Sequence, residues 1–174
     1  MSIDFSIKES DEIDGVFIVE PSISVDTRGN IWTSFLQTDI CKLVSDGADF
    51  KHDKFSLSKK NVLRGIHGDS KSWKLVTCVY GEIKQVVVDF RENSSTYLKW
   101  QSFEINGQEP KLILIPPLMG NAYYVYSDKA VYHYKLAYDG DYIDADEQFS
   151  FKWDDPKINI NWPTKEPVLS ERDK

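Results

Sequence analysis

Residues 74–90, which read KLVTCVYGEIKQVVVDF, decide the fold class of this chain. They contain two apolar, β-branched runs joined at the turn-prone Tyr80-Gly81-Glu82, and this pattern predicts a β-hairpin. Turn-prone clusters also occur at residues 27–30, 105–107 and 138–141. Similar short runs recur along the sequence, namely GVFIVEP, FKHDKFSLS, WQSFEI, LILIPP, AYYVYS and AVYHYKLAY. Many short strands separated by turns predict an all-β sandwich or barrel.

Helical patterning is scarce outside these runs. Residues 35–47 (FLQTDICKLVSDG) form one candidate helix that would end at Gly47, and the acidic stretch at 143–149 could hold a further helical turn. A length of 174 residues suits one domain with a sizeable core. We therefore expect a single all-β domain over residues 1–174 with a few short helices.

The composition is that of an ordinary globular protein, with 41% apolar and 28% charged residues. A formal net charge of −7 and a pI near 5.0 give no basic footprint for DNA or RNA, so we expect no nucleic-acid partner. A small phosphate-bearing ligand needs only a local cluster of Arg and Lys. No run of eighteen apolar residues occurs, and the start, MSIDFSIKES, lacks the features of a signal peptide. We expect a soluble, cytoplasmic protein with no membrane partner.

The inventory of metal ligands is poor. The chain has three histidines, His52, His67 and His133, and no HxH, HExxH or paired-cysteine pattern. A catalytic metal on neighbouring strands normally draws several histidines and a carboxylate. Cys41 and Cys78 are far apart in the sequence, and we expect free thiols. The sequence therefore predicts neither a metal nor another cofactor.

The segment KNVLRGIHG carries two side chains suited to chemistry. Arg64 and His67 are three residues apart, so in an extended strand they would point to opposite faces unless Gly65 bends it. Spacing alone favours the simpler interpretation, in which His67 is half-buried against a backbone carbonyl and Arg64 is a surface ion-pair partner.

Lys74 opens the run KLVTCVYG. If Val76 and Cys78 point inward, Lys74 does too, and a buried lysine needs a partner such as an anionic ligand. The alternative is an edge lysine that prevents strand pairing, and both interpretations stay open.

In VYHYKLAY, Tyr132 and Tyr134 share one face of the expected strand, and His133 and Lys135 share the other. One of the two faces should be interior. By pattern alone, the tyrosine stripe is core filling more often than chemistry.

Taken together, these segments resemble the RmlC family, the dTDP-4-dehydrorhamnose 3,5-epimerases. The combination of KNVLRGIH, KLV and GE-x-x-x-V-x-V-D-x-R is specific. The resemblance runs in order over nearly the whole chain, from DTRGNIWTSF through KKNVLRGIHG, KLVTCVYGEIKQVVVDFRENSSTYLKW, LILIPPLMGNAYYV and YKLAY to FKWDDPKINI, NWP and LSERDK. It implies a jelly-roll cupin sandwich that needs no metal and forms a homodimer.

The resemblance implies a role for each matching side chain. The histidine of RGIH, His67, would be the general base, and the tyrosine before the lysine of YK, Tyr134, the general acid. Asp173 of LSERD would pair with the base histidine and fix its tautomer. Lys74 would stabilise the charge of an enolate. The implied substrate-binding residues are Arg28, Arg64, Asn121 and Lys111.

These residue types suit epimerisation beside a keto group. A 4-keto group acidifies the hydrogens at C3 and C5 of a sugar, so a base on one face can remove a proton and leave an enolate. An acid on the opposite face then returns a proton with inverted configuration. The prediction is an isomerase that inverts C3, C5 or both of a nucleotide-diphospho-4-keto sugar, in polysaccharide-precursor biosynthesis.

The chain departs from the family pattern in three places. The family's IPEGFAHGF carries a histidine where this chain reads IPPLMGNAYY with Asn121, and an amide cannot titrate near neutral pH. The family's RGFF reads RGNI at residues 28–31, and its aromatic pair after YKxT becomes Tyr138-Asp139-Gly140. Because those aromatics are associated with nucleobase binding, the nucleotide is left open between dTDP and GDP, and the sugar between a 6-deoxyhexose and a heptose.

Two other functions are compatible with parts of the sequence. Related 3,4-ketoisomerases rely on a histidine pair, so Asn121 and Tyr134 favour the epimerase. A non-catalytic sugar-nucleotide binding module would fit the change at Asn121. Chain ends fray, and Asp173 is therefore expected to be held only when a substrate or a partner subunit packs over it.

Overall fold

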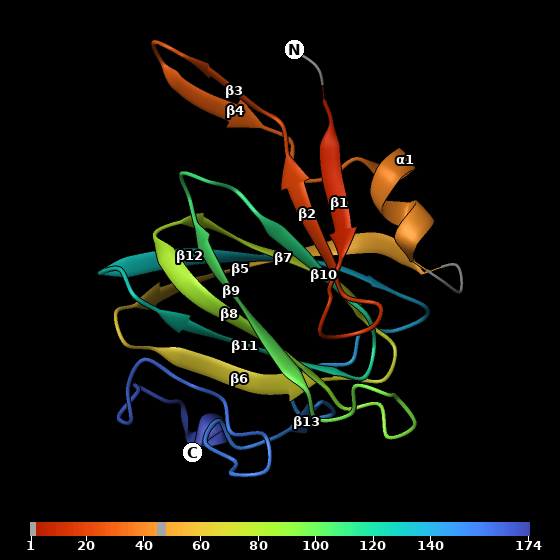
Figure 1. The fold of residues 1–174 in the computed structure, drawn as a ribbon, viewed down its shortest axis with the longest axis vertical. Helices are drawn as coiled ribbons and strands as arrows, with labels where there is room; N and C mark the ends of the chain where they lie inside the picture. Colours follow the sequence, from red (N-terminus) through yellow and green to blue (C-terminus); the bar gives the residue numbers. More distant parts are fainter. Residues whose placement is uncertain (1–2, 45–47) are drawn as a thin grey trace.

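The computed structural model describes residues 3–44 and 48–174. Two antiparallel sheets form a sandwich, as the run of short strands predicted (Figure 1). The first sheet contains β1 (Phe5–Glu9), β2 (Phe17–Pro21), β5 (Asp49–Lys59), β7 (Trp73–Tyr80), β10 (Leu112–Ile115) and β12 (Lys129–Tyr138). The second contains β6 (Leu63–Gly68), β8 (Glu82–Asp89), β9 (Trp100–Asn106), β11 (Met119–Val125) and β13 (Phe149–Ser150). The strand orders are β1-β2-β10-β7-β12-β5 and β13-β6-β11-β8-β9.

The strands follow the apolar runs of the sequence closely. β7 and β8 are the two runs of residues 74–90, separated at Gly81, although they lie in different sheets and do not pair with each other. The prediction of a hairpin there is therefore wrong. Each of the two strands is buried on both faces and lies between two other strands of its own sheet. β7 pairs with β10 and β12, and β8 pairs with β11 and β9.

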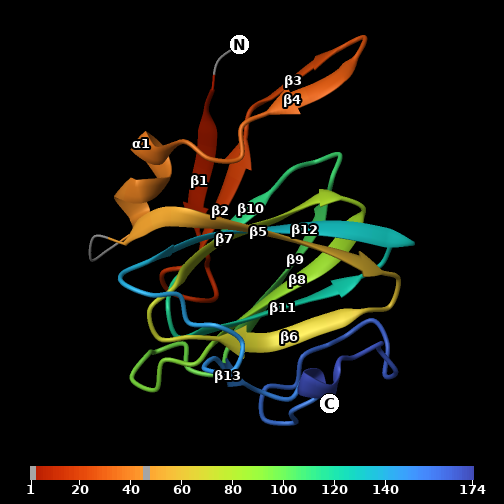
Figure 2. The same cartoon turned by 180° about the vertical axis from the view of Figure 1, so that it is seen from behind.

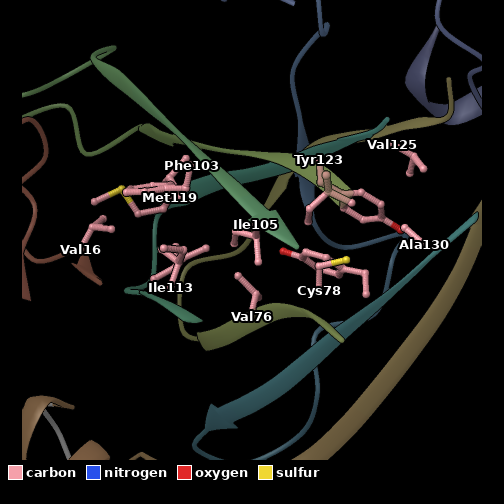
Figure 3. Packing of buried hydrophobic residues seen from close by; sticks show 14 of the residues in the cluster. Val16, Val76, Cys78, Phe103, Ile105, Ile113, Met119, Tyr123, Val125 and Ala130 are labelled. Carbon is pink, nitrogen blue, oxygen red and sulfur yellow. The ribbon is translucent and has the colours of Figure 1, made fainter. Parts of the chain in front are cut away.

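The main core lies between the two sheets. Alternate residues of β7, Val76 and Cys78, face this core, as expected for a period of two. They pack against residues of β9, β10 and β11, among them Ile105, Ile113 and Tyr123 (Figure 3). This packing sets the distance between the two sheets, and with it the distance between the polar residues that face inward from each sheet.

The outer faces of both sheets are also partly covered. α1 (Gln37–Ile40) and η1 (Cys41–Leu43) place Ile40 against Trp73 and Leu75, on the outer side of the first sheet. The helix predicted over residues 35–47 is thus confirmed in part, and its predicted end, Gly47, lies outside the described residues. The expected turn within 143–149 is present at residues 145–147. None of the described helices is long and apolar enough to cross a membrane.

Two segments extend from opposite ends of the sandwich. The hairpin of β3 (Ile23–Asp26) and β4 (Gly29–Trp32) projects from one end, and both views show it apart from the other strands (Figures 1 and 2). The C-terminal tail, with η2 (Glu171–Asp173), lies at the other end, beside β6.

Candidate active site

A cavity of about 300 Å³ lies between the sheets, near the C-terminal tail. Its lining comes from strands of both sheets, from the segment 142–148 and from the tail. The cavity brings together the side chains predicted to be catalytic, which are His67 of β6, Lys74 of β7, Tyr134 of β12 and Asp173 of η2. Arg64 and Asn121, two of the predicted substrate-binding residues, line it as well.

A bulge in β6 turns Arg64 and His67 toward this one cavity. Asn121 of β11 pairs with His67 and Tyr123 pairs with Arg64, so three steps along β6 oppose two along β11. Gly65 lies in the bulge at φ +119°, and a Cβ there would lie 2.6 Å from the carbonyl oxygen of Asn121. The bend that the spacing of Arg64 and His67 required is therefore present, and it needs glycine.

His67 lies beside the carboxylate of Asp173. Nε2 of His67 is 2.7 Å from Oδ1 of Asp173. Ser170 Oγ donates to Oδ2 at 2.7 Å. Burial alone would raise the pKa of Asp173, but the contacts with His67 and Ser170 hold it below its ordinary value. An ionised Asp173 can stabilise the imidazolium that forms when His67 accepts a proton.

The tail that carries Asp173 is held by the chain itself. Val168 forms a parallel bridge with Val62, and its N–H donates to the carbonyl of Asn61 at 2.8 Å. η2 then leaves Asp173 only 5% exposed. The expectation that Asp173 needs a substrate or a partner subunit to hold it is wrong, because the bridge and η2 already bury the carboxylate.

Lys74 points to the inside of the sandwich, on the side of Val76 and Cys78. β7 lies between β10 and β12, so the edge-lysine interpretation is wrong. Its Nζ is 3.0 Å from Oδ2 of Asp69, and the two residues are only 6% and 2% exposed. The partner that a buried lysine needs is thus a carboxylate of the same chain.

Tyr134 is half-buried on the inner face of β12. Its ring packs edge-on against Tyr132 at a centroid distance of 4.5 Å, and Tyr132 stacks on Tyr123 at 4.2 Å. Burial, and then the neighbouring Tyr123, raise the pKa of Tyr134 above its ordinary value, while Arg64 opposes the shift. The phenol therefore keeps its proton at neutral pH, as a general acid must before it donates.

Asn121 belongs to a buried hydrogen-bond network on the cavity wall. The side-chain amide nitrogen of Gln85 donates to Oδ1 of Asn121 at 2.6 Å, and the Tyr132 hydroxyl donates to Oε1 of Gln85 at 2.6 Å. Gln85 is fully buried and Asn121 is 7% exposed. Because Oδ1 is already occupied, the amide nitrogen of Asn121 is the group left to meet a ligand.

Two predicted substrate-binding residues lie away from the cavity. Arg28 is in the turn of the β3–β4 hairpin with 88% of its side chain exposed, and it pairs with Asp26 at 2.6 Å. Lys111 precedes β10 and lies 3.7 Å from Glu20. Neither lines the cavity within this chain, because the hairpin projects from the opposite end and Lys111 faces β2.

Several cavity residues were not predicted from the sequence. They are Lys54, Ser56, Leu136, Tyr142, Asp144, Ala145, Gln148, Ser170 and Arg172. Lys54 and Ser56 share a strand face in FKHDKFSLS, which was a usable signal. Leu136 lies on β12 two residues after Tyr134, and the remaining residues depend on how the segment 142–148 and the tail fold over the cavity. Within 3–44 and 48–174, no three His, Cys, Asp or Glu side chains are grouped as a metal ion would require.

Residues 10–174 match the family of dTDP-4-dehydrorhamnose 3,5-epimerase. The chain belongs to this family. It is 34% identical over 165 residues to the dTDP-4-dehydrorhamnose 3,5-epimerase of Shigella flexneri, which covers 93% of this chain and 90% of the relative.

Solved structures of relatives agree with this assignment. The epimerase RmlC from Legionella pneumophila, in complex with dTDP-4-keto-L-rhamnose, superimposes with a TM-score of 0.89 at 34% identity, over 98% of this chain and 90% of that one. A 3'-monoepimerase from Streptomyces bikiniensis, in complex with dTDP-quinovose, gives 0.85 at 27% identity, over 95% and 84%. The predicted RmlC-like sandwich is confirmed, and the protein is an isomerase of the dTDP-4-keto-sugar 3,5-epimerase type.

Proposed function

We propose that this epimerase inverts C3, C5 or both of a nucleotide-diphospho-4-keto sugar, with His67 as the base and Tyr134 as the acid. The observation that supports the proposal is that His67, Lys74 and Tyr134 line one cavity from three different strands. His67 belongs to the second sheet and Tyr134 to the first. A sugar bound between the sheets would meet the base on one face and the acid on the other, as inversion requires.

Lys74 completes the proposed chemistry. Removal of a proton beside the 4-keto group leaves negative charge on the keto oxygen, which becomes an enolate. A buried cation directed at that oxygen lowers the barrier more than an exposed one, since little water screens it. The burial of Lys74 on the cavity wall supports this role.

Three cations of the cavity lining suit the diphosphate of the substrate. Lys54 lies on β5, Arg64 on β6 and Arg172 in the tail, and all three line the same cavity. Arginine is suited to phosphate by its planar fork of donors. We assign Arg64 and Arg172 to direct phosphate contacts and Lys54 to charge balance.

The proposal includes a homodimer. The edge strand β5 exposes Phe55 and Leu57 at 62% and 64%, and the projecting hairpin exposes Val25 and Ile31 at 74% and 59%. Such exposed apolar groups are typical of surfaces that pack against another chain. Arg28, on the same hairpin, can contact a substrate only if it reaches the cavity of a second copy.

The nucleotide stays open between dTDP and GDP in this proposal. Tyr142 lines the cavity and packs edge-on against His52 at 4.8 Å, while Nζ of Lys54 lies 4.8 Å from the Tyr142 ring centroid. This aromatic group supports stacking of a base, which either nucleotide would satisfy. The cytoplasmic location expected from the sequence also remains a prediction.

The test is proton NMR of dTDP- and GDP-linked 4-keto sugars incubated with the protein in deuterium oxide. Deuterium entering at C3, C5 or both would give the regiochemistry and the nucleotide together. His67→Asn should remove exchange, since it lacks the base, and Tyr134→Phe should remove inversion, since it lacks the acid that protonates the opposite face. Conversion of the substrate to a 3-keto sugar would instead establish a ketoisomerase, and binding without exchange a non-catalytic module.

A further inference from the structure

The carboxylate of Asp69 is tied down before any substrate arrives. Asp69 follows β6 in the connection to β7. Its Oδ1 accepts the backbone N–H groups of Ser72 at 2.6 Å and Lys71 at 3.1 Å. Its Oδ2 accepts from Nζ of Lys74 at 3.0 Å. One oxygen therefore anchors the carboxylate to the backbone and the other is left for Lys74.

The ammonium of Lys74 has more donors than this pair uses. A protonated lysine carries three N–H bonds, and Asp69 takes one of them. Among the residues that the structure describes, Nζ has no other hydrogen-bond partner, and the side chain lines the cavity. Two N–H bonds are therefore available to a ligand oxygen.

We propose that Asp69 is a positioning residue for the epimerase reaction: it keeps Lys74 charged and aims the free N–H bonds of Lys74 at the oxygen that becomes an enolate. Asp69 itself touches no reacting atom in this scheme. The inference rests on the proposed function, because it gives Lys74 the enolate as its target.

The surroundings of Lys74 make such support necessary. Three further cations line the cavity, Lys54 on β5, Arg64 on β6 and Arg172 in the tail, and each disfavours another positive charge. Burial also lowers the pKa of Lys74 below its ordinary value, and the Asp69 carboxylate opposes that shift. Without Asp69 the ammonium would lose its proton at lower pH.

The remaining titratable groups of the cavity do not replace Asp69. Asp173 is engaged with His67 and Ser170, and Asp144 is exposed in the segment that follows β12. Tyr134 and Tyr142 also line the cavity, and a neutral phenol supplies no countercharge. Among the described residues, Asp69 is the carboxylate in ion-pair contact with Lys74.

Asp69→Asn is the decisive variant because it changes charge and little else. An asparagine oxygen can still accept from the backbone of Ser72, so the connection keeps its shape. The titration of Lys74 is followed directly, by NMR of protein labelled with 13C at lysine Cε, and Lys74→Met assigns the signal. In Asp69→Asn the midpoint should fall by about 1 to 3 pH units.

The pH profile of catalysis supplies the second readout. In Asp69→Asn, the alkaline decline in the rate of deuterium incorporation should begin at a lower pH than in the wild type, by the same amount. The reason is that uncharged Lys74 no longer stabilises the enolate. Asp89→Asn is the matched control. It removes another buried, paired carboxylate, whose partner Arg91 lies outside the cavity, and it should leave both midpoints in place.

A reciprocal measurement tests the same pair from the side of Asp69. Coupling between two titrating groups is mutual, so Lys74→Met should raise the midpoint of the Asp69 carboxyl, followed by 13C NMR, by a similar amount. The proposal is overturned, and Asp69 is only structural, if the NMR midpoints of Lys74 and Asp69 both stay in place. It is also overturned if Asp69→Asn lowers the rate but the alkaline decline of the rate stays at the wild-type pH. If the wild-type protein exchanges no deuterium, the proposed function fails, while the NMR midpoints still report on the pair.

Discussion

Two carboxylates pair with basic side chains at the same cavity, and the chain holds them in different ways. Asp69 lies between two long strands, and its carbonyl oxygen accepts the N–H of Leu118 at 2.8 Å. Asp173 lies in the tail, which the bridge between Val168 and Val62 joins to the chain just before β6. Val168 itself is 56% exposed. One carboxylate lies in a short connection between two strands, and the other lies in a tail that is attached to the sheets.

The difference concerns local stability. Short segments with few buried contacts open at a much lower free energy than the strands of a core. Asp173 can therefore leave His67 when the tail opens, whereas Asp69 leaves Lys74 only when the connection between β6 and β7 unfolds. Loss of the tail pair should affect activity first, and loss of the sheet pair should affect stability as well.

Lys74→Met should cause the largest loss of stability. It leaves the Asp69 carboxylate buried without its cation, and breaking a buried pair in this way costs about 3–5 kcal/mol. Urea unfolding followed by circular dichroism gives the free energy. Replacing both partners, Lys74→Met with Asp69→Leu, should recover most of it. A double variant as unstable as the single one would show that the pairing is not the cause.

Asp173→Asn should lower the rate more than the stability. The variant keeps the shape but loses the charge that stabilises a protonated His67. A hydrogen bond to a charged group contributes about 1.5–3 kcal/mol, which corresponds to a loss in kcat of roughly 10- to 100-fold. Deuterium exchange at C3 and C5 measures it. An unchanged kcat, or an unfolding free energy lowered as much as in Lys74→Met, would remove the contrast between the two pairs.

Asp89 extends the comparison to a carboxylate that a strand holds outside the cavity. Bonds from Arg91, Ser94 and Thr96 outweigh burial and lower its pKa from 3.8 to about 2. A lowered pKa stabilises the fold above the unfolded value, and the contribution disappears as pH falls toward 2. Asp89→Asn should therefore cost about 2 kcal/mol at pH 6 and almost nothing near pH 2, by unfolding at each pH. If the loss of unfolding free energy did not depend on pH, its cause would be the changed shape of the side chain and not the lost charge.

Val168→Pro should have the smallest effect on stability and still reach the active site. Proline lacks the N–H that donates to Asn61, so the tail loses one bond worth about 0.5–1.5 kcal/mol. The rate should fall several-fold toward that of Asp173→Asn. Val168→Thr keeps the N–H and serves as the control. Wild-type activity in the proline variant would mean that the tail is fixed by its other contacts.

The sequence predicted most strands because local pattern determines them. The runs that became β7 and β8 are short and apolar with turn signals between them, and such a run predicts a strand whichever partner it pairs with. The pairing of strands was not predictable in the same way, as the separation of β7 from β8 shows. Which sheet a strand joins depends on contacts between residues far apart in the chain, and a turn signal carries no information about them.

The site was predictable where strand geometry or a family motif placed it. His67, Lys74 and Tyr134 meet because each occupies an inward position of a buried strand. Asp69 was not predicted, since an aspartate in Gly-Asp-Ser reads as a surface turn. Arg28 was expected at the site, but its hairpin makes no ladder with either sheet, so no local pattern indicates where it points.

The cavity wall and the cavity rim are encoded by separate parts of the chain. The proton carriers and Lys74 come from strands of the two sheets, whereas Tyr142, Gln148 and Arg172 come from a loop and the tail. Substitutions in the loop need not disturb the packing that sets the distance between base and acid. Substrate preference can thus diversify by mutation of the rim while the reaction is inherited unchanged, and a library confined to residues 139–148 is the natural starting point for altering the preferred nucleotide.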